Sequence, residues 1–408
     1  MATKYVNSQL KAITDDWYLC YSNFIPEVRN QFTPAKKISL ADCTLRDGEQ
    51  QAGIVFTWED KVKIAAQLDR AGMTEIEAGT PASSPSDEKA AREIVKLNTK
   101  SKITALSRAT KEDIDLMCDI GVWGANISLP IGDLQRKYKL KWDDEKYINT
   151  CLEITEYARS KGLHVNLSPF DTTRCDLDFL DKVLAALKNS GNVDRVKLVD
   201  TVGSAIPEAL TYMVRRMKKT LKDTPIEVHV HNDFGMGVAN TTAALMAGAE
   251  VASTSMNGLG ERCGNASTEQ LALALQMLYG IDIGIDSTEI LKTAQLISEL
   301  SGVPIPQFMP ITGRNAFSHE TGMAVAGLLS MSYTAEAYNP AIVGQERHIL
   351  LGKKSGKASV EAKLDELKMT YNTEQVEELL AEIKEFATQR KRCLTDEEFA
   401  DMADKKLR

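Results

Sequence analysis

Two patterns of hydrophobic residues alternate along residues 38–285. Short runs rich in β-branched residues indicate buried strands, and the longer amphipathic stretches that follow them indicate helices. Strands are expected at 38–44, 74–79, 102–108, 124–130, 163–169, 195–201, 227–233 and 251–258. Helices are expected at 59–71, 87–97, 111–120, 144–161, 176–189, 207–221, 238–249 and 268–279. Strict alternation of eight strands and eight helices predicts an α/β fold, a (β/α)8 TIM barrel over 38–285.

A doubly wound open sheet is the alternative to the barrel. That fold usually carries a Gly-x-Gly-x-x-Gly turn after its first strand, and none follows residues 38–44 here. The alternation therefore favours the closed barrel.

The two ends of the chain differ from the barrel region. Residues 1–37 are expected to form a helical N-terminal extension with an aromatic face that includes Trp17 and Phe24. Residues 286–408 are expected to hold a proline-marked linker near 303–313, a lid, and two or three charged amphipathic helices over 358–402.

Composition narrows the class of protein. The 408 residues are 43% hydrophobic with a net charge of −8 and no run of Lys and Arg, which argues against nucleic-acid binding. No apolar run approaches the roughly 18 residues that span a membrane, and the N-terminus lacks a signal-peptide core. Seven scattered cysteines without a Cys-x-x-Cys pair suggest neither disulfides nor a zinc knuckle. We expect a cytoplasmic enzyme.

Two of the five histidines lie close together, in Glu227-Val-His229-Val-His231-Asn-Asp233. In a strand, side chains two positions apart point to the same face, so both imidazoles would converge on one point, as a divalent metal requires. An isolated pair of this kind is more often part of a solvated strand face. The barrel context favours the metal, because active sites lie at the C-terminal ends of barrel strands.

Polar residues gather at the ends of other predicted strands. Arg46 and Asp47 follow the first strand, Glu77 and Arg108 end the second and third, and Thr201 ends the sixth. The eighth strand leads into a glycine-rich segment, 257–265, which contains Glu261 and Asn265. These residues are expected to share one rim of the barrel.

A carboxylate with two imidazoles suits Mg, Mn, Zn, Co or Fe(II) and leaves coordination positions open for substrate. Asp47, His229 and His231 are the expected ligands, and Asn265 is placed to add an amide oxygen. Such a metal polarises the ketone of a 2-oxo acid. Arg46 would stabilise negative charge on the substrate oxygen, or else form a salt bridge at the barrel mouth.

For three further residues, the sequence is compatible with two different roles. Glu77 and Glu261 either act on the substrate or pair with Arg46 and Arg262. Thr201 either binds a substrate carboxylate or caps its strand.

Three segments together resemble the homocitrate synthase / 2-isopropylmalate synthase family of metal-dependent TIM-barrel enzymes. They are Asp42-Cys-Thr-Leu-Arg-Asp-Gly-Glu-Gln50, His229-Val-His231-Asn-Asp233 and Asn257-Gly-Leu-Gly-Glu-Arg-Cys-Gly-Asn265. The resemblance extends from about residue 37 to 357, and residues 128–140 are most similar to homocitrate synthases of the nitrogenase-cofactor type.

The resemblance implies an acyltransferase of the 2.3.3 class, which condenses acetyl-CoA with a 2-oxo acid and hydrolyses the thioester. It implies a divalent metal held by Asp47, His229 and His231 beside Asn265, with Arg46 at the oxyanion. Candidate catalytic residues are Arg46, Glu261 and His319; candidate substrate-binding residues are Gln50, Glu77, Arg108 and Thr201. Family members commonly form homodimers.

The sequence departs from the family pattern at three positions. Phe170 replaces an acid after the fifth strand, Ala324 replaces the second histidine of the lid, and Ala335 replaces the lid tyrosine. His319 remains as a candidate base. These changes keep open an (R)-citrate synthase or a phosphonomethylmalate synthase-like activity, a lyase of the same superfamily, and a non-catalytic oxo-acid-binding relative.

Overall fold

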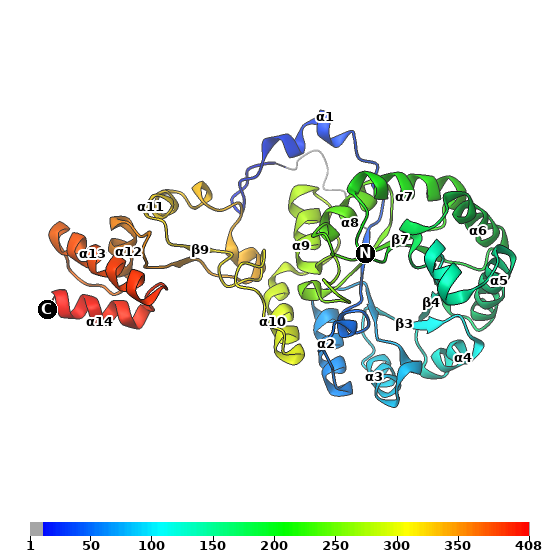
Figure 1. Cartoon of the computed structure of the whole chain (residues 1–408). Coiled ribbons are helices and arrows are strands. Elements are labelled where there is room, and N and C mark those ends of the chain that lie inside the picture. Colours follow the sequence, from blue (N-terminus) through cyan, green and yellow to red (C-terminus); the bar gives the residue numbers. More distant parts are fainter. Residues whose placement is uncertain (1–10, 408) are drawn as a thin grey trace. The chain divides into compact units, whose positions relative to one another are not determined.

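The computed structural model describes residues 11–407. Eight parallel strands pair in sequence order, and β8 pairs back to β1, so that the sheet closes into a barrel (Figure 1). The strands are β1 Ser39–Asp42, β2 Glu75–Glu77, β3 Lys102–Arg108, β4 Gly124–Ser128, β5 His164–Ser168, β6 Arg195–Asp200, β7 Ile226–Val230 and β8 Val251–Thr254. The predicted (β/α)8 fold is confirmed.

Helices follow the strands around the outside of the barrel (Figure 1). They are α2 Trp58–Arg70, α3 Pro85–Lys96, α4 Lys111–Ile120, α5 Asp144–Ser160, α6 Leu177–Ser190, α7 Pro207–Leu221, α8 Gly237–Met246 and α9 Thr268–Leu273. A π-helical turn, η4 Gln135–Leu140, precedes α5, and another, η7 Ala274–Leu278, continues α9.

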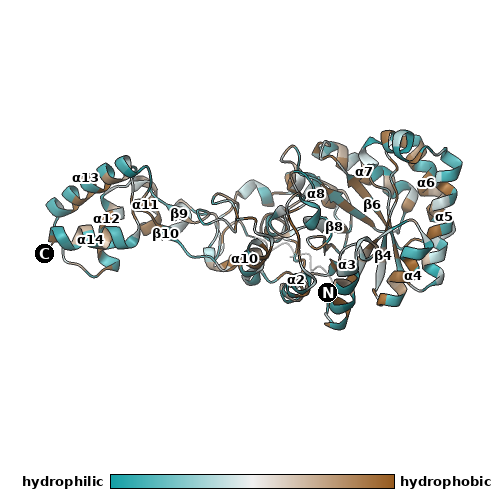
Figure 2. Cartoon of the chain, turned by 60° about the horizontal axis from the view of Figure 1, so that its bottom comes forward, coloured by the Kyte–Doolittle hydropathy of each residue, from teal (hydrophilic) through white to brown (hydrophobic). Residues whose placement is uncertain are grey.

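Local sequence signals set where these helices begin and end. Thr57 and Asp60 form a capping box at the start of α2, which satisfies two otherwise unpaired backbone N–H groups. Helix α4 starts after the Thr110 cap and ends at Gly121, whose φ of 86° is left-handed and suits glycine. The helices bury apolar residues against the strands and turn polar residues outward (Figure 2).

The interior of the barrel is filled with polar side chains. Most TIM barrels are filled by layers of Val, Ile and Leu. Here, the buried residues that contact one another across the interior include Glu75, Asn126, Asn166, Arg195 and Glu227. Apolar strand residues such as Ile76 and Val228 belong instead to the main hydrophobic core. Charge buried at this depth must be paired, and these groups are.

The chain divides into two compact units, and the boundary differs from the one expected at residue 285. Among described residues, the first unit comprises Ser22–Ile305 and the second comprises residues 11–21 and 306–407. Helix α10, Ile290–Ser301, stays with the barrel because Thr293 accepts a hydrogen bond from Gln67 of α2 and because Ala294 and Ile297 are buried in the core.

The helical extension expected at the N-terminus is wrong for most of its described part. Only η1 Tyr21–Phe24 and α1 Pro26–Arg29 are helical there, and residues 1–10 lie outside the described range. The backbone at Trp17 forms an antiparallel bridge with Tyr338 instead. The aromatic residue at 17 therefore belongs to a segment that pairs through its backbone and not to a helix.

The second unit has its own small core. Three helices, α12 Lys357–Glu366, α13 Thr373–Arg390 and α14 Asp396–Leu407, pack around Val360, Leu379 and Phe399, as expected for 358–402. A short strand pair, β9 Ser318–His319 with β10 His348–Ile349, and helix α11 Gly322–Ser330 complete it.

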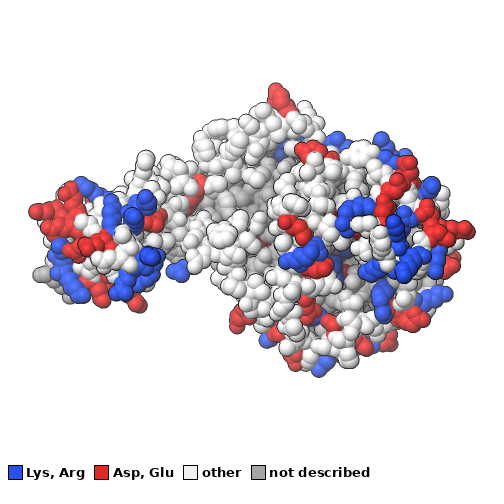
Figure 3. Space-filling model, viewed as in Figure 1, with Lys and Arg blue, Asp and Glu red and all other residues white. Residues whose placement is uncertain are grey.

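Acidic and basic side chains are interspersed on the visible face of each unit (Figure 3). Among described residues, no helix is both long and apolar enough to cross a membrane.

Candidate active site

The two histidines and Asp47 converge at the C-terminal end of the barrel. His229 lies on β7, and His231 follows the strand, where its backbone forms a bridge with Asn265. Asp47 comes from the loop after β1. The donor atoms of the three side chains lie within 4.8 Å of one another, and all three side chains are buried. Sequence reasoning placed these three residues together, and the structure does so.

The imidazoles face each other through the nitrogens that would hold a metal. His229 Nε2 lies 3.3 Å from His231 Nε2, and His229 Nδ1 lies 3.0 Å from the Ser253 hydroxyl of β8. If Nδ1 of His229 is the protonated nitrogen, its Nε2 presents a lone pair to the cluster. Two imidazole nitrogens and one carboxylate at these separations form a donor set that fits a divalent metal.

The charge states of the cluster also suit a metal. Burial lowers the pKa of His229 well below 6.5, and burial likewise lowers the pKa of His231, so both are neutral ligands near pH 7. Burial alone would raise the pKa of Asp47, but Arg46 and the two imidazoles together bring it below its usual value of 3.8. Asp47 is therefore an anionic ligand.

Arg46 is fixed beside the cluster by two ion pairs. Its Nη1 donates to Asp47 Oδ1 over 2.7 Å, and its Nε donates to Glu77 Oε2 over 2.9 Å. Nη2 has no hydrogen-bond partner among the described residues, and the side chain is 10% exposed. The guanidinium can thus keep both pairs and still donate to a substrate oxygen. Glu77 is the partner of Arg46, one of its two expected roles.

Asn265 lies in the cluster with its N–H group toward Asp47. Nδ2 donates to Asp47 Oδ2 over 2.6 Å and to the Leu259 carbonyl over 3.0 Å, while Oδ1 is buried without a partner in the part of the chain that the structure describes. In this conformation Asn265 orients Asp47, and Oδ1 is the atom of the Asn265 side chain that is suited to a metal. Gly260 makes the approach possible, since a Cβ there would lie 2.3 Å from Asn265 Nδ2.

Other predicted site residues lie farther out on the rim. Arg108 is paired with Asp113 and is largely exposed, and the Thr201 hydroxyl accepts a hydrogen bond from the Asp171 N–H. Gln50 is exposed on η2 Gly48–Gln50; its neighbour Gln51 instead accepts a hydrogen bond from the glycine-rich loop.

Two predicted catalytic residues form ion pairs of their own. Glu261 is about half exposed and pairs with Arg262 over 3.2 Å. His319 belongs to the second unit, where its Nε2 lies 3.1 Å from Glu336, which also binds Arg347.

Sequence reasoning missed several residues that support the cluster. Ser253 orients His229, and Asn126 donates to Glu77. Asn126 lies on β4, two strands along the barrel from Glu77 on β2, and a lone Asn in a strand does not reveal such a partner.

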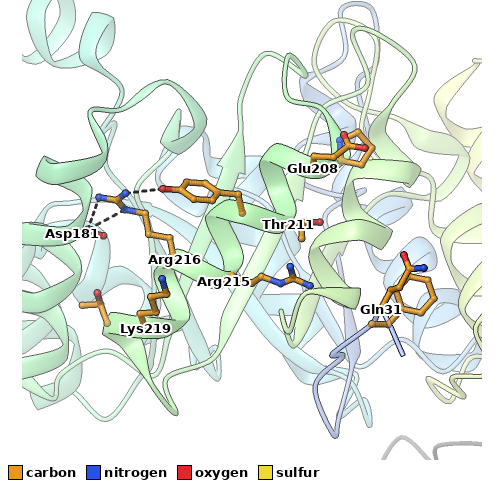
Figure 4. A pocket seen from close by; sticks show the side chains of 11 residues that line it. Gln31, Asp181, Glu208, Thr211, Arg215, Arg216 and Lys219 are labelled. Carbon is orange, nitrogen blue, oxygen red and sulfur yellow. Dashed lines mark hydrogen bonds and ion pairs between the residues drawn. The ribbon is translucent and has the colours of Figure 1, made fainter. Parts of the chain in front are cut away.

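A hollow of about 870 Å³ lies on the outer surface of the barrel, along α7 (Figure 4). Arg216 is held there by Asp181 and Tyr212, and Arg215 extends toward Gln31 (Figure 4). None of the metal-cluster residues lines this hollow.

Comparison with known proteins yields two family matches. The HMGL-like family model matches residues 37–297, and the model for a homocitrate synthase post-HMGL domain matches residues 311–391. A probable 2-isopropylmalate synthase of Ignicoccus hospitalis is 39% identical over 372 residues, which are 91% of this chain and 93% of that protein. Homocitrate synthase AksA of Methanopyrus kandleri is 39% identical over 381 residues, 93% of this chain and 95% of that protein.

Solved structures agree on the fold. The HMG-CoA lyase of Bacillus subtilis superposes with a TM-score of 0.60 at 22% identity, covering 69% of this chain and 98% of that chain.

Proposed function

The chain belongs to the HMGL-like family, among the 2-isopropylmalate and homocitrate synthases, and we propose that it condenses acetyl-CoA with a 2-oxo acid and releases CoA. The observation that carries this proposal is the buried Asp47–His229–His231 cluster with Arg46 locked against it. The cluster is suited to a chelating oxo acid, and the guanidinium is suited to the oxygen that gains charge when the ketone is attacked.

Asp47, His229 and His231 would hold Mg, Mn, Zn or Co, with the free oxygen of Asn265 beside them. When bound, the metal supplies Lewis-acid polarisation of the ketone of the oxo acid. The protein contributes two neutral imidazoles and one carboxylate with a single negative charge. A bound divalent metal would therefore leave the cluster with a net positive charge, which suits an anionic substrate.

Arg46 would donate from Nη2 to the oxygen that becomes an alkoxide. Its pKa is raised because the attraction of Glu77 and Asp47 outweighs the cost of its burial, so it stays charged throughout. Because both ion pairs exist before substrate binds, the donor needs no reorganisation when charge develops.

For the acceptor, we propose a homocitrate synthase-like reaction on 2-oxoglutarate. Support comes from the homocitrate synthase post-HMGL match over 311–391 and from the similarity to homocitrate synthase AksA. Oxaloacetate and phosphonopyruvate are the alternatives that follow from the changes at Phe170, Ala324 and Ala335. The similarity to 2-isopropylmalate synthases makes 2-oxoisovalerate a further candidate acceptor.

The test is a thiol-release assay with acetyl-CoA, each of the four metals, and a panel of acceptors: 2-oxoglutarate, oxaloacetate, 2-oxoisovalerate, pyruvate and phosphonopyruvate. CoA release that needs one acceptor supports the proposal. Arg46→Lys should retain bound metal but lose most turnover, since a point charge does not reproduce the fixed fork of the guanidinium. Metal-loaded protein that releases no CoA with any acceptor would refute it.

A further inference from the structure

A chain of hydrogen bonds runs through the barrel from Arg46 to charges buried deeper in the interior. Glu77 accepts from Arg46 through Oε2 and from Asn126 Nδ2 through Oε1, over 2.8 Å. Asn126 Oδ1 accepts from Asn166 Nδ2 over 2.8 Å, and the same Nδ2 donates to Glu227 Oε2 over 2.7 Å. Four strands and the loop after β1 contribute to this single connection.

The end of this hydrogen-bond series that lies farthest from Arg46, at Glu227, is held rigidly. Glu227 also binds Arg195 Nε over 2.9 Å and Lys197 Nζ over 2.8 Å. Arg195 makes a two-point pair with Glu75, with distances of 2.8 and 2.6 Å. Every one of these side chains is buried, so water does not compete for their hydrogen bonds.

Chemistry fixes which way each amide points. Glu77 and Glu227 carry charge-paired carboxylates that accept hydrogen bonds, so the atoms of Asn126 and Asn166 facing them must be the NH2 groups. The oxygen of Asn126 is then left to accept from Asn166, as observed. Neither amide can flip without setting oxygen against oxygen.

We propose that Asn126 and Asn166 are positioning residues, which hold Glu77 and through it fix the guanidinium of Arg46 for the reacting oxygen. Glu77 reaches Arg46 with one oxygen only, so its carboxylate would be free to turn without the second contact. Asn126 supplies that contact, and Asn166 fixes Asn126. The kinetic consequences rest on the proposed function, whereas the immobilisation of Arg46 does not.

Asn126→Leu tests this directly. Leucine has nearly the shape of asparagine and is a usual residue inside TIM barrels, so this variant should fold. Asn166→Leu removes only the hydrogen bond that fixes Asn126 and should have a smaller effect. This second variant tests the proposal if Asn126→Leu is unstable. Asn149→Leu, exposed on α5, is the matched control.

The first measurement is side-chain NMR on protein labelled with ¹⁵N-arginine, with Arg46 assigned by the loss of its signals in Arg46→Lys. In the parent protein and in Asn149→Leu, the two ion pairs should slow rotation about Nε–Cζ and give separate Nη signals. In Asn126→Leu these signals should merge. Separate signals that persist in both Asn126→Leu and Asn166→Leu would overturn the proposal, whatever reaction the protein catalyses.

The second measurement is kinetic, with the acceptor found in the thiol-release assay. Asn126→Leu should lower kcat by about 10–100-fold, as is usual when a contact that orients an active-site group is lost, and leave the KM for acetyl-CoA unchanged. In an Arg46→Lys background, Asn126→Leu should cause little further loss, because its effect passes through Arg46. Full additivity of the two losses would contradict positioning. A parent protein inactive with all acceptors refutes the proposed function, and the NMR result still decides this inference.

Discussion

Replacing His231 with alanine is expected to remove the metal site without removing the fold. The side chain contributes one of three clustered donors, and its Nδ1 has no protein partner among the described residues, so little else depends on it. The backbone bridge from His231 to Asn265 does not require the imidazole. Two donors, Asp47 and His229, would remain.

The size of the effect follows from the number of donors. Structural zinc sites with four ligands bind with about 10–16 kcal/mol, or about 2.5–4 kcal/mol for each ligand. Loss of one imidazole should therefore weaken binding by roughly 10²–10³-fold. Burial amplifies the loss, because the two remaining donors stay in a site from which water is largely excluded.

The assay is competition for Zn²⁺ or Co²⁺ against a chromophoric chelator, with thermal unfolding in parallel. Metal at about 100 times its dissociation constant for the parent protein should stabilise the parent by about 2.7 kcal/mol and raise its Tm, but should stabilise His231→Ala by no more than about 0.4 kcal/mol. His348→Ala, an exposed histidine of the second unit, is the control and should bind metal normally. Parent-like affinity in His231→Ala would refute the ligand assignment.

Four further expectations follow. Ser253→Ala should lower metal affinity about 10–100-fold in the same competition assay, because it removes the hydroxyl that orients an imidazole. Asp42 is buried, and burial raises its pKa to about 7 from 3.8. The folded form thus holds a proton that the unfolded form releases, so its contribution to stability falls as pH rises from about 4 to 7. Asp42→Asn, which cannot titrate, should exceed the parent in urea unfolding free energy above pH 7 by up to about 4 kcal/mol, and equal curves at pH 8 would contradict this. Lys197→Met should cost about 3–5 kcal/mol in the same unfolding measurement, because it leaves a buried carboxylate partly uncompensated. Arg108→Ala removes a largely exposed guanidinium proposed to bind the second carboxylate of an acceptor. It should raise the KM for acceptors with two carboxylates by about tenfold or more and leave the KM for 2-oxoisovalerate unchanged. Equal changes in the two KM values would show that Arg108 does not bind that carboxylate.

The parts of the site that the sequence predicts are those governed by short-range geometry. His229 and His231 share a face because extended backbone places alternate residues on one side, and this holds even though β7 ends at Val230. Asp47 follows from the rule that loops after barrel strands gather at one rim.

The parts that sequence reasoning misses depend on partners far apart in the chain. Asn166 and Glu227 are 61 positions apart, and nothing local to either residue indicates their hydrogen bond. The direction of the Asn265 amide is likewise decided by Asp47 and the Leu259 carbonyl, which only the folded loop brings near. Aromatic spacing near Trp17 resembled a helix face, but a backbone pairing with Tyr338 overrides that preference.

Charge balance links the barrel interior to the chemistry at its mouth. Two buried cations and one that is 10% exposed, Arg46, face three buried carboxylates; the other members are Arg195, Lys197, Glu75, Glu77 and Glu227. This network is neutral by itself, so the cluster keeps the single negative charge of Asp47. A divalent cation makes the cluster positive by one charge, and the carboxylate of a chelating 2-oxo acid neutralises it. Uncompensated charge is expensive in a buried site, so this balance favours one carboxylate at the metal. Arg195 and Lys197 are already paired inside the barrel, and Nη2 of Arg46 is assigned to the ketone oxygen, so we expect the second carboxylate of an acceptor such as 2-oxoglutarate to be bound outside the barrel interior.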